Sequence, residues 1–159
     1  MLKLPDGNYF WEMNYIAQNK KAFHDYEILE KVEAGIALTG AEVKSIRGGK
    51  VNLSDSYAQV TSEGEMFLNS LHISPYTRLG FYTPDPYRKR KLLLRKKQII
   101  HLSNEVDRKQ LTLIPLAMYF QKQWVKVELG LCRGRKKFDK RQKIAEEDSK
   151  RRLAQLKKR

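Results

Sequence analysis

The sequence predicts an all-β fold: a small closed antiparallel barrel of about six strands, with two or three short helices and a basic tail. Strand-like runs are joined into hairpins at 57–73 and again at 111–131, whereas helix signals are few and short. Closing the sheet into a barrel removes its exposed edges, so this architecture suits many short strands without an internal repeat.

The first strand of the barrel should begin at Tyr26. From there Tyr26, Ile28 and Val32 alternate with charged residues, although the pattern is less regular around 29–30. Gly35 then interrupts a run that resumes with apolar residues. We expect a bulge or a sharp bend at Gly35, because glycine within a strand pattern is typical of both.

A short helix and a hairpin should follow this strand. Thr39 and Glu42 have the spacing of a capping box, which predicts a helix of about two turns that ends at Gly48. Strands are then expected at 57–61 and 66–73, because a turn-forming S-E-G-E segment separates two runs of strand-like composition.

The second half of the body predicts a loop, a helix and a further hairpin. Residues 75–91 hold three of the five prolines and end in four consecutive basic residues, which indicates a loop with a charged edge. Apolar residues at i, i+3 and i+7 predict a helix over about 95–107. The strands at 111–120 and 125–131 should pair across a short polar connection.

Composition and charge divide the chain into three parts. They are an aromatic leader of unknown order (1–14), the barrel (15–131) and a basic tail (132–159). The tail holds thirteen Lys/Arg against four Asp/Glu, a net charge of +9 out of +14 for the whole chain. It has few large apolar side chains, so we expect it to be disordered when free and helical once phosphates neutralise it. A basic extension on a compact body is typical of nucleic-acid binders.

Several function classes lack their sequence signals. The three histidines and Cys132 have no metal-ligand spacing, and no nucleotide-binding or nucleophile motif occurs, so we expect neither an enzyme nor a metal or cofactor. A single cysteine fits the reducing cytoplasm. No signal peptide, membrane-spanning run or wide apolar stripe supports a membrane partner.

Five segments, in one order along the chain, resemble the SsrA-binding protein (SmpB) family. They are N-K-K-A-F-H-D-Y (19–26), E-A-G-I-A-L-T-G-A-E-V-K-S (33–45), N-L-S-D-S-Y (52–57), R-K-L-L-L (90–94) and G-R-K-K-F-D-K-R (134–141). The leader through Trp11 is not part of the family pattern. Phe138 stands where some members have a polar or imidazole side chain, so an imidazole mechanism does not carry over.

The resemblance implies an OB-like barrel that binds the tRNA-like domain of transfer-messenger RNA and brings it to stalled ribosomes, without being an enzyme. The tail would occupy the empty mRNA channel beside the decoding centre, and the protein would act as a monomer. The RNA-contacting residues expected in the body are Asn19, Lys20, Lys21, His24, Glu33, Lys44, Arg47, Arg90, Lys91 and Leu92. Those expected to bind the ribosome are Gly134, Arg135, Lys136, Lys137, Phe138, Asp139, Lys140 and Arg141, with Asp139 capping the tail helix.

Each of these residues also has an ordinary structural interpretation. Taken alone, Glu33 is more often a solvated strand residue, although a carboxylate can accept from a base amino group and so supply selectivity. Lys44 and Arg47 could form a solvated helix face, and Tyr119 and Trp124 are more often core or cross-strand residues than stacking platforms.

Three other function classes remain open on the residues alone. A general single-strand binder would gather its aromatic residues on one sheet face. A small nuclease would need clustered carboxylates or a His–Glu pair in a pocket. A structural ribosomal protein would stay with translating ribosomes without any small RNA.

Overall fold

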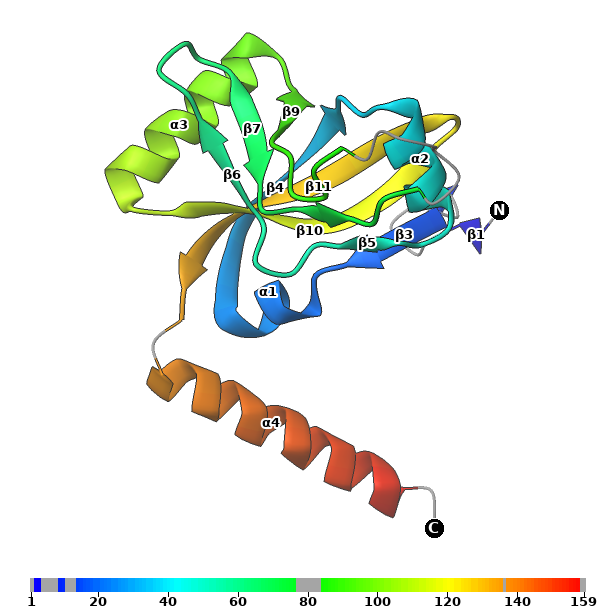
Figure 1. Cartoon of the computed structure of the whole chain (residues 1–159). Helices are drawn as coiled ribbons and strands as arrows, with labels where there is room; N and C mark the ends of the chain where they lie inside the picture. The colour runs from blue at the N-terminus through cyan, green and yellow to red at the C-terminus, as the bar shows by residue number, and fades with distance from the viewer. Residues whose placement is uncertain (1, 4–8, 11–13, 77–83, 136, 158–159) are drawn as a thin grey trace.

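Six antiparallel strands close into a ring at the centre of the computed structural model, which describes residues 2–3, 9–10, 14–76, 84–135 and 137–157 (Figure 1). The strands run in the order β11-β4-β9-β7-β6-β10, and β10 pairs back onto β11. Their bounds are β4 (Tyr26–Ile36), β6 (Tyr57–Val60), β7 (Met66–Asn69), β9 (Arg90–Leu93), β10 (Thr112–Gln121) and β11 (Trp124–Gly134). The predicted six-stranded antiparallel barrel is confirmed.

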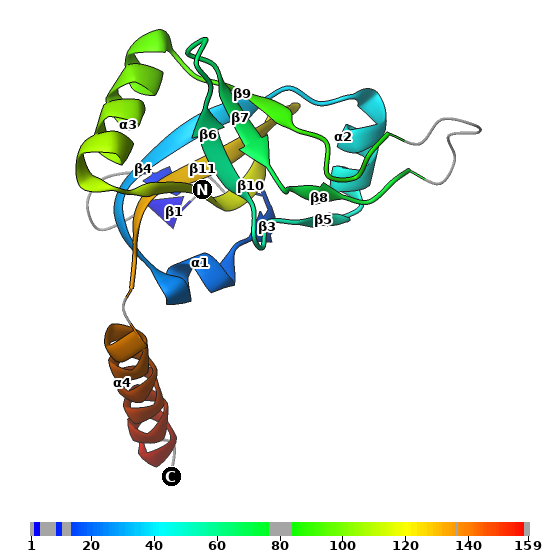
Figure 2. The same ribbon diagram turned by 60° about the vertical axis from the view of Figure 1, so that its left-hand side comes forward.

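Shorter elements complete the ring and cover its ends. The strand β3 (Asn14–Gln18) adds to β10, and two small ladders pair β1 (Leu2–Lys3) with β2 (Tyr9–Phe10) and β5 (Val51–Asn52) with β8 (His72–Ile73). The helices are α1 (Lys20–Asp25), α2 (Gly40–Arg47), α3 (Lys96–Lys109) and α4 (Lys137–Leu156). Both views place α2 and α3 at opposite ends of the barrel, while α4 extends away from it (Figures 1 and 2).

The barrel interior is filled by aliphatic side chains from every strand of the ring. Leu68 of β7, Leu92 of β9 and Val127 of β11 are almost completely buried, as are Leu102 of α3 and Ile46 of α2. These residues belong to one contiguous cluster, so the two helices close the same core that the strands surround. Burial of such aliphatic side chains is the main driving force for this architecture.

The two hairpins and the two longer predicted helices lie close to where the sequence places them, but the strand predicted over 66–73 is divided. β7 ends at Asn69, Ser70 has φ +59°, and His72–Ile73 forms β8, which pairs with β5. β10 and β11 pair from Gln121–Trp124 outwards, and Lys122 in the turn has φ +57°, as a two-residue hairpin turn requires. α2 has the expected capping box, in which Thr39 Oγ1 accepts from the Glu42 amide at 3.2 Å and Glu42 Oε1 accepts from the Thr39 amide at 2.9 Å.

The expected bulge at Gly35 is wrong. β4 continues through Gly35 to Ile36, and its register shift lies instead beside Leu29, the residue between the partners of Leu131 and Cys132. Glycine is needed at 35 for a different reason: a Cβ there would lie 3.2 Å from the Leu93 Cβ of the adjacent strand β9. The glycine therefore allows close strand approach and does not break the strand.

The barrel also extends further than the boundary at 131 that the sequence predicts. Cys132 is completely buried, and β11 continues pairing with β4 as far as Gly134. The Arg135 amide then donates to the Asp25 carbonyl at 3.0 Å. Residues 132–135 are therefore part of the body, because cross-strand hydrogen bonds hold them in spite of their polar composition.

Glu42 connects α2 to the segment before and within β9. Its carboxylate, 4 % exposed, accepts from Arg88 and from Arg90 Nε, the latter at 2.5 Å. Arg90 also donates to the carbonyls of Leu71 (2.5 Å) and Pro86 (3.0 Å). Burial alone would raise the pKa of Glu42, but the hydrogen bonds from the Thr39 amide and the two guanidinium groups outweigh it and hold the pKa below its ordinary value.

We expect Glu42→Gln to lower the free energy of unfolding by about 3–5 kcal/mol at pH 7, because it leaves the Arg90 charge buried without its counter-charge. A carboxyl with a lowered folded-state pKa stabilises above its unfolded pKa and loses that contribution as the pH falls through the folded value. The variant should therefore lose stability less steeply than wild type below about pH 5. Urea denaturation between pH 3 and 7 measures both effects.

The matched control is Glu105→Gln, which removes the ion pair from Glu105 to Lys109 on the surface of α3. Its unfolding midpoint should stay close to that of wild type. Similar losses for the two variants would contradict the central role of Glu42.

Candidate nucleic-acid interface

The helix α1 presents three candidate residues, and a buried amide holds it in place. Asn19, 3 % exposed, caps the helix by accepting from the Ala22 amide at 3.1 Å. Its Nδ2 donates to the carbonyls of Pro115 (3.0 Å) and Leu53 (3.3 Å). Asn19 was predicted to contact RNA, but its amide is fully used inside the protein. These hydrogen bonds orient α1 relative to the barrel.

The cations of α1 lie at the surface that Asn19 orients. Lys20 and Lys21 are exposed, and His24 is partly exposed. Lys21 Nζ lies 2.7 Å from Asp55 Oδ1, and this hydrogen bond raises the pKa of Lys21. His24 Nδ1 lies 2.9 Å from Asp25 Oδ1. Lys20 has no acidic partner within 4.0 Å in the described part of the chain, so it is the cation of α1 most available to a phosphate.

The first four residues of the segment R-K-L-L-L form β9, and their side chains alternate between the core and the surface. Arg90 and Leu92 are each 1 % exposed, whereas Lys91 and Leu93 lie outside the barrel. The sequence predicts that Arg90, Lys91 and Leu92 all contact RNA. Only Lys91 can reach a ligand in this structure, and it lies 3.1 Å from Glu65 of the β6–β7 turn. The other two shape the surface from within.

Two cations of α2 lie against aromatic rings. Lys44 Nζ is 5.3 Å from the centroid of the Tyr76 ring, and Arg47 Cζ is 5.9 Å from that of Phe120. Both side chains are exposed, and neither has a carboxylate within 4.0 Å among the described residues. Cation–π contact restrains a side chain without neutralising its charge, so both remain suited to phosphate contact.

Glu33 is an exposed carboxylate on β4 with fixed partners on the neighbouring strands. Its Oε2 accepts a hydrogen bond from the Tyr119 hydroxyl of β10, and its Oε1 lies 3.9 Å from Lys126 Nζ of β11. Tyr119 is 4 % exposed, as its prediction as a core residue requires. The contact between Glu33 and Tyr119 has no local sequence signal, although the hairpin register that places Tyr119 opposite Lys126 follows from the turn at 122–123.

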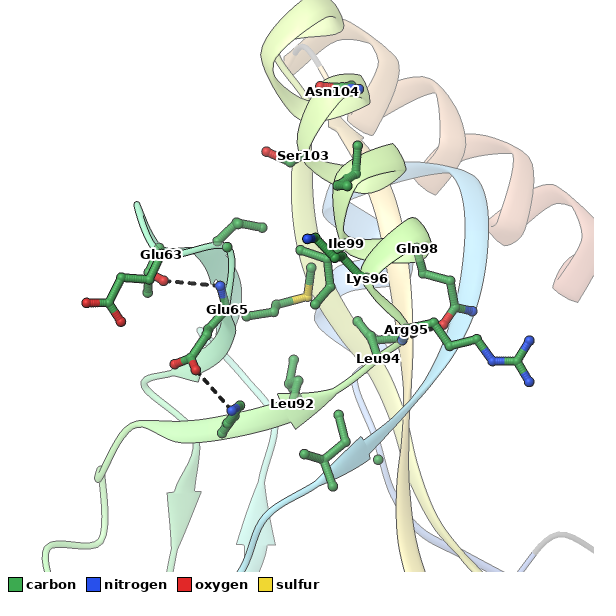
Figure 3. A pocket seen from close by; sticks show the side chains of 18 of the residues that line it. Glu63, Glu65, Leu92, Leu94, Arg95, Lys96, Gln98, Ile99, Ser103 and Asn104 are labelled. Atoms are coloured by element: carbon green, nitrogen blue, oxygen red, sulfur yellow. Dashed lines mark hydrogen bonds and ion pairs between the residues drawn. The ribbon is translucent and has the colours of Figure 1, made fainter.

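A groove of about 1150 Å³ begins at Glu33 and runs between the β6–β7 turn and α3. In Figure 3 the acids of the turn, Glu63 and Glu65, lie on one side, and Lys96 and Gln98 of α3 lie on the other, with Leu92 between them. The groove thus combines an apolar base with charged walls. Such a surface can accept a base edge at one point and a phosphate at another.

The tail begins beside α1 and continues as a long helix. Gly134 ends β11, Arg135 is tied to α1, and Lys136 lies outside the described residues. Lys137, Phe138, Asp139 and Lys140 form the start of α4, but their side chains also lie outside the described part; Arg141 is exposed.

Residues 137–156 form the helix α4, the conformation that the sequence predicts for the tail on the ribosome; disorder in the free protein stays a prediction. The tail differs from its prediction in one respect: the helix begins at Lys137, so Asp139 lies inside its first turn and is not the capping residue. An acid in the first turn still stabilises a helix through the macrodipole. Lys143 Nζ donates to the Phe23 carbonyl at 2.5 Å, which links α4 to α1.

The described residues offer neither a metal site nor a reactive cysteine. No group of three or more His, Cys, Asp or Glu in the described ranges could hold a metal ion. Cys132 is completely buried, and burial raises the pKa of its thiol to about 11, so it is not a reactive nucleophile. No described helix has the length and apolar character that crossing a membrane requires.

Comparison with known proteins identifies close relatives. The chain matches the family described as SmpB protein over residues 16–159. It is 54% identical over 138 residues to the SsrA-binding protein of Desulfitobacterium hafniense (strain DSM 10664 / DCB-2), covering 87% of this chain and 88% of the relative. It is 54% identical over 144 residues to the SsrA-binding protein of Syntrophobacter fumaroxidans (91% and 89%).

One solved structure is also similar. The chain in "tmRNA-SmpB: a journey to the center of the bacterial ribosome" is 50% identical, with a TM-score of 0.64, over 76% of this chain and 85% of that chain.

We expect Asn19→Ala to lower the free energy of unfolding by about 1–3 kcal/mol, because it removes a helix cap and two buried hydrogen bonds. Thermal or urea denaturation measures the change. Lys20→Ala is the matched control, since Lys20 is adjacent but exposed, and its stability should equal that of wild type. Equal stability of both variants would contradict the assignment of Asn19 as the residue that holds α1.

Proposed function

The chain belongs to the SmpB family, and on this premise we propose that it binds the tRNA-like domain of transfer-messenger RNA and delivers that RNA to stalled ribosomes. There the RNA would direct tagging of the unfinished polypeptide (trans-translation). The protein acts as an RNA-binding monomer in the cytoplasm and not as an enzyme. The named relatives and the solved SmpB chain with tmRNA support this assignment.

The observation that carries the proposal is the division of positive charge between two separate elements. One element is the body, where Lys20 and Lys21 of α1, Lys44 and Arg47 of α2 and Glu33 of β4 are all exposed. The other is the segment 132–159, which carries +9 of the chain's net charge of +14 and whose helix α4 extends away from the barrel (Figure 2). A chain with two basic surfaces can hold a folded RNA with one and a second RNA surface with the other.

Each element would have a distinct task. The body recognises the tRNA-like domain, with Lys20, Lys21, Lys44 and Arg47 contacting phosphates and Glu33 accepting from a base donor. Asn19, Arg90 and Leu92 support this surface from beneath. The tail would enter the empty mRNA channel, with the segment 134–141 near the decoding centre and the rest of α4 along the channel.

A general single-strand binder fits the structure less well. The exposed aromatic side chains of the described residues lie on separate elements: Tyr15 on β3, Phe23 on α1, Tyr57 on β6, Tyr87 in a loop and Trp124 on β11. Base stacking along a strand would need them on one face. Sequencing the RNA that co-purifies with the protein tests the proposal directly: transfer-messenger RNA should dominate. Competition by polyU as strong as by the tRNA-like domain would contradict it.

The first functional prediction separates specificity from charge. Glu33→Ala should reduce the preference for the tRNA-like domain over an unrelated hairpin, because a carboxylate accepts only from particular donors. Lys20→Ala should weaken binding to both RNAs and flatten the plot of log affinity against log salt by about 0.7–0.9. Filter binding at several salt concentrations measures both. Equal effects of the two variants on both RNAs would refute this division of roles.

The second concerns the tail. Alanine at Asp139, Lys140 and Arg141 together should leave the affinity for the tRNA-like domain within about twofold of wild type, since these residues lie outside the body surface. The same variant should abolish tagging in a reconstituted translation system stalled on a truncated message.

The matched control replaces Asp148, Lys150 and Arg151 by alanine, which removes the same charges further along α4. It should retain more tagging than the first variant. If both variants tag normally, the assignment of the 134–141 segment to the decoding region is wrong.

A further inference from the structure

Tyr119 is a buried residue whose hydroxyl donates a hydrogen bond to the exposed side chain of Glu33. Its ring is enclosed between strands, with the Tyr15 ring edge-on at 6.0 Å, and its hydroxyl reaches Glu33 Oε2 across the barrel surface. The two residues are 86 positions apart in sequence and lie on β10 and β4, with β11 between them. The contact therefore depends on the assembled barrel.

The other charged groups around Glu33 do not hold its side chain in place. Glu33 lies directly opposite Glu128 in the β4–β11 ladder, and like charges so placed repel. Lys31 lies 3.6 Å from Glu128, whereas Lys126 is 3.9 Å from Glu33, beyond good hydrogen-bond distance. The phenol hydroxyl is thus the one hydrogen-bond donor that the described residues supply to the Glu33 side chain.

The hydrogen bond from Tyr119 uses only one of the two carboxylate oxygens of Glu33. Oε2 is bound to the phenol, while the side chain as a whole is 45% exposed and Oε1 can accept from a ligand. A tyrosine has few rotatable bonds and this one is packed, so it fixes a glutamate that would otherwise sample many rotamers. A base donor then meets a carboxylate already in place, which reduces the ordering cost of binding.

The Tyr119 hydroxyl also remains a hydrogen-bond donor over a wide pH range. Burial first, and then the hydrogen bond to Glu33, raise the pKa of Tyr119 well above its ordinary value. The hydroxyl therefore remains protonated throughout the pH range in which RNA is handled, and it can only donate to the carboxylate.

We propose that Tyr119 is a positioning residue that sets RNA specificity by holding Glu33 Oε2, so that Oε1 is presented to a base amino or imino donor. This inference rests on the proposed function, because it assigns a determinant of the same RNA surface. Tyr119 itself does not touch the RNA.

The test is Tyr119→Phe, which keeps the ring and removes only the hydroxyl. The ratio of affinities for the tRNA-like domain and an unrelated hairpin of equal length should fall about five- to tenfold, as expected for one hydrogen bond. The salt slope should stay unchanged, because no phosphate contact is lost. Tyr15→Phe, on the adjacent ring, is the matched control and should keep the wild-type ratio.

A double-mutant cycle distinguishes positioning from a merely structural role. Glu33→Ala combined with Tyr119→Phe should discriminate no worse than Glu33→Ala alone, because the hydroxyl acts only through that carboxylate. Additive losses, or an equal weakening for both RNAs, would overturn the inference. So would a Tyr119→Phe variant that keeps the wild-type ratio while Glu33→Ala loses it.

A wild-type protein with no preference for the tRNA-like domain would instead overturn the proposed function, and the inference with it. Thermal denaturation of Tyr119→Phe completes the experiment. A loss of the affinity ratio in a variant that melts as wild type supports positioning; a loss seen only in partly unfolded protein counts against it.

Discussion

The buried carboxylate of Glu42 is the interaction on which much of this surface depends. It caps its own helix and binds the guanidinium groups of Arg88 and Arg90, 46 and 48 residues later in the chain. Arg90 is 1 % exposed, and all three of its guanidinium nitrogens donate hydrogen bonds inside the protein. Nε donates to Glu42, and the two terminal nitrogens donate to the carbonyls of Leu71 and Pro86. Because successive side chains of a strand alternate, the inward Arg90 places Lys91 outside and Leu92 inside. One ion pair thus decides which residues of β9 face a ligand.

A buried polar side chain also fixes the position of α1. Asn19 holds α1 from below in the way that Arg90 holds β9, and in each case the family motif contains both the supporting residue and the exposed cations beside it. Such motifs combine recognition with the local structure that recognition needs. A motif residue is therefore not by itself a contact residue, and burial separates the two roles.

Much of the fold could be predicted from the sequence because its signals are local. The capping box of α2, the hairpin of β10 and β11 and the apolar face of α3 each arise within a few residues. β9 could not be predicted, because its first residue is a charged side chain that is buried only by pairing with the distant Glu42. The six-residue α1 likewise depends on a tertiary contact, and Cys132 continues a strand only because β4 lies beside it. The candidate site shows the same division: its exposed cations were identified, but the link from Tyr119 to Glu33 exists only in the closed barrel.

The short connection between the barrel and α4 has a consequence for how two weak contacts combine. A single residue, Lys136, separates Arg135, which is tied to α1, from the start of the helix, and the twenty residues of α4 span about 30 Å. In the proposed function, one RNA held by the body would keep the tail near its own target at an effective concentration in the millimolar range, typical of short linkers. Neither contact then needs high affinity alone. Avidity would exist only where both surfaces are presented at the right separation, so the geometry of the chain would itself select a ribosome whose channel is empty.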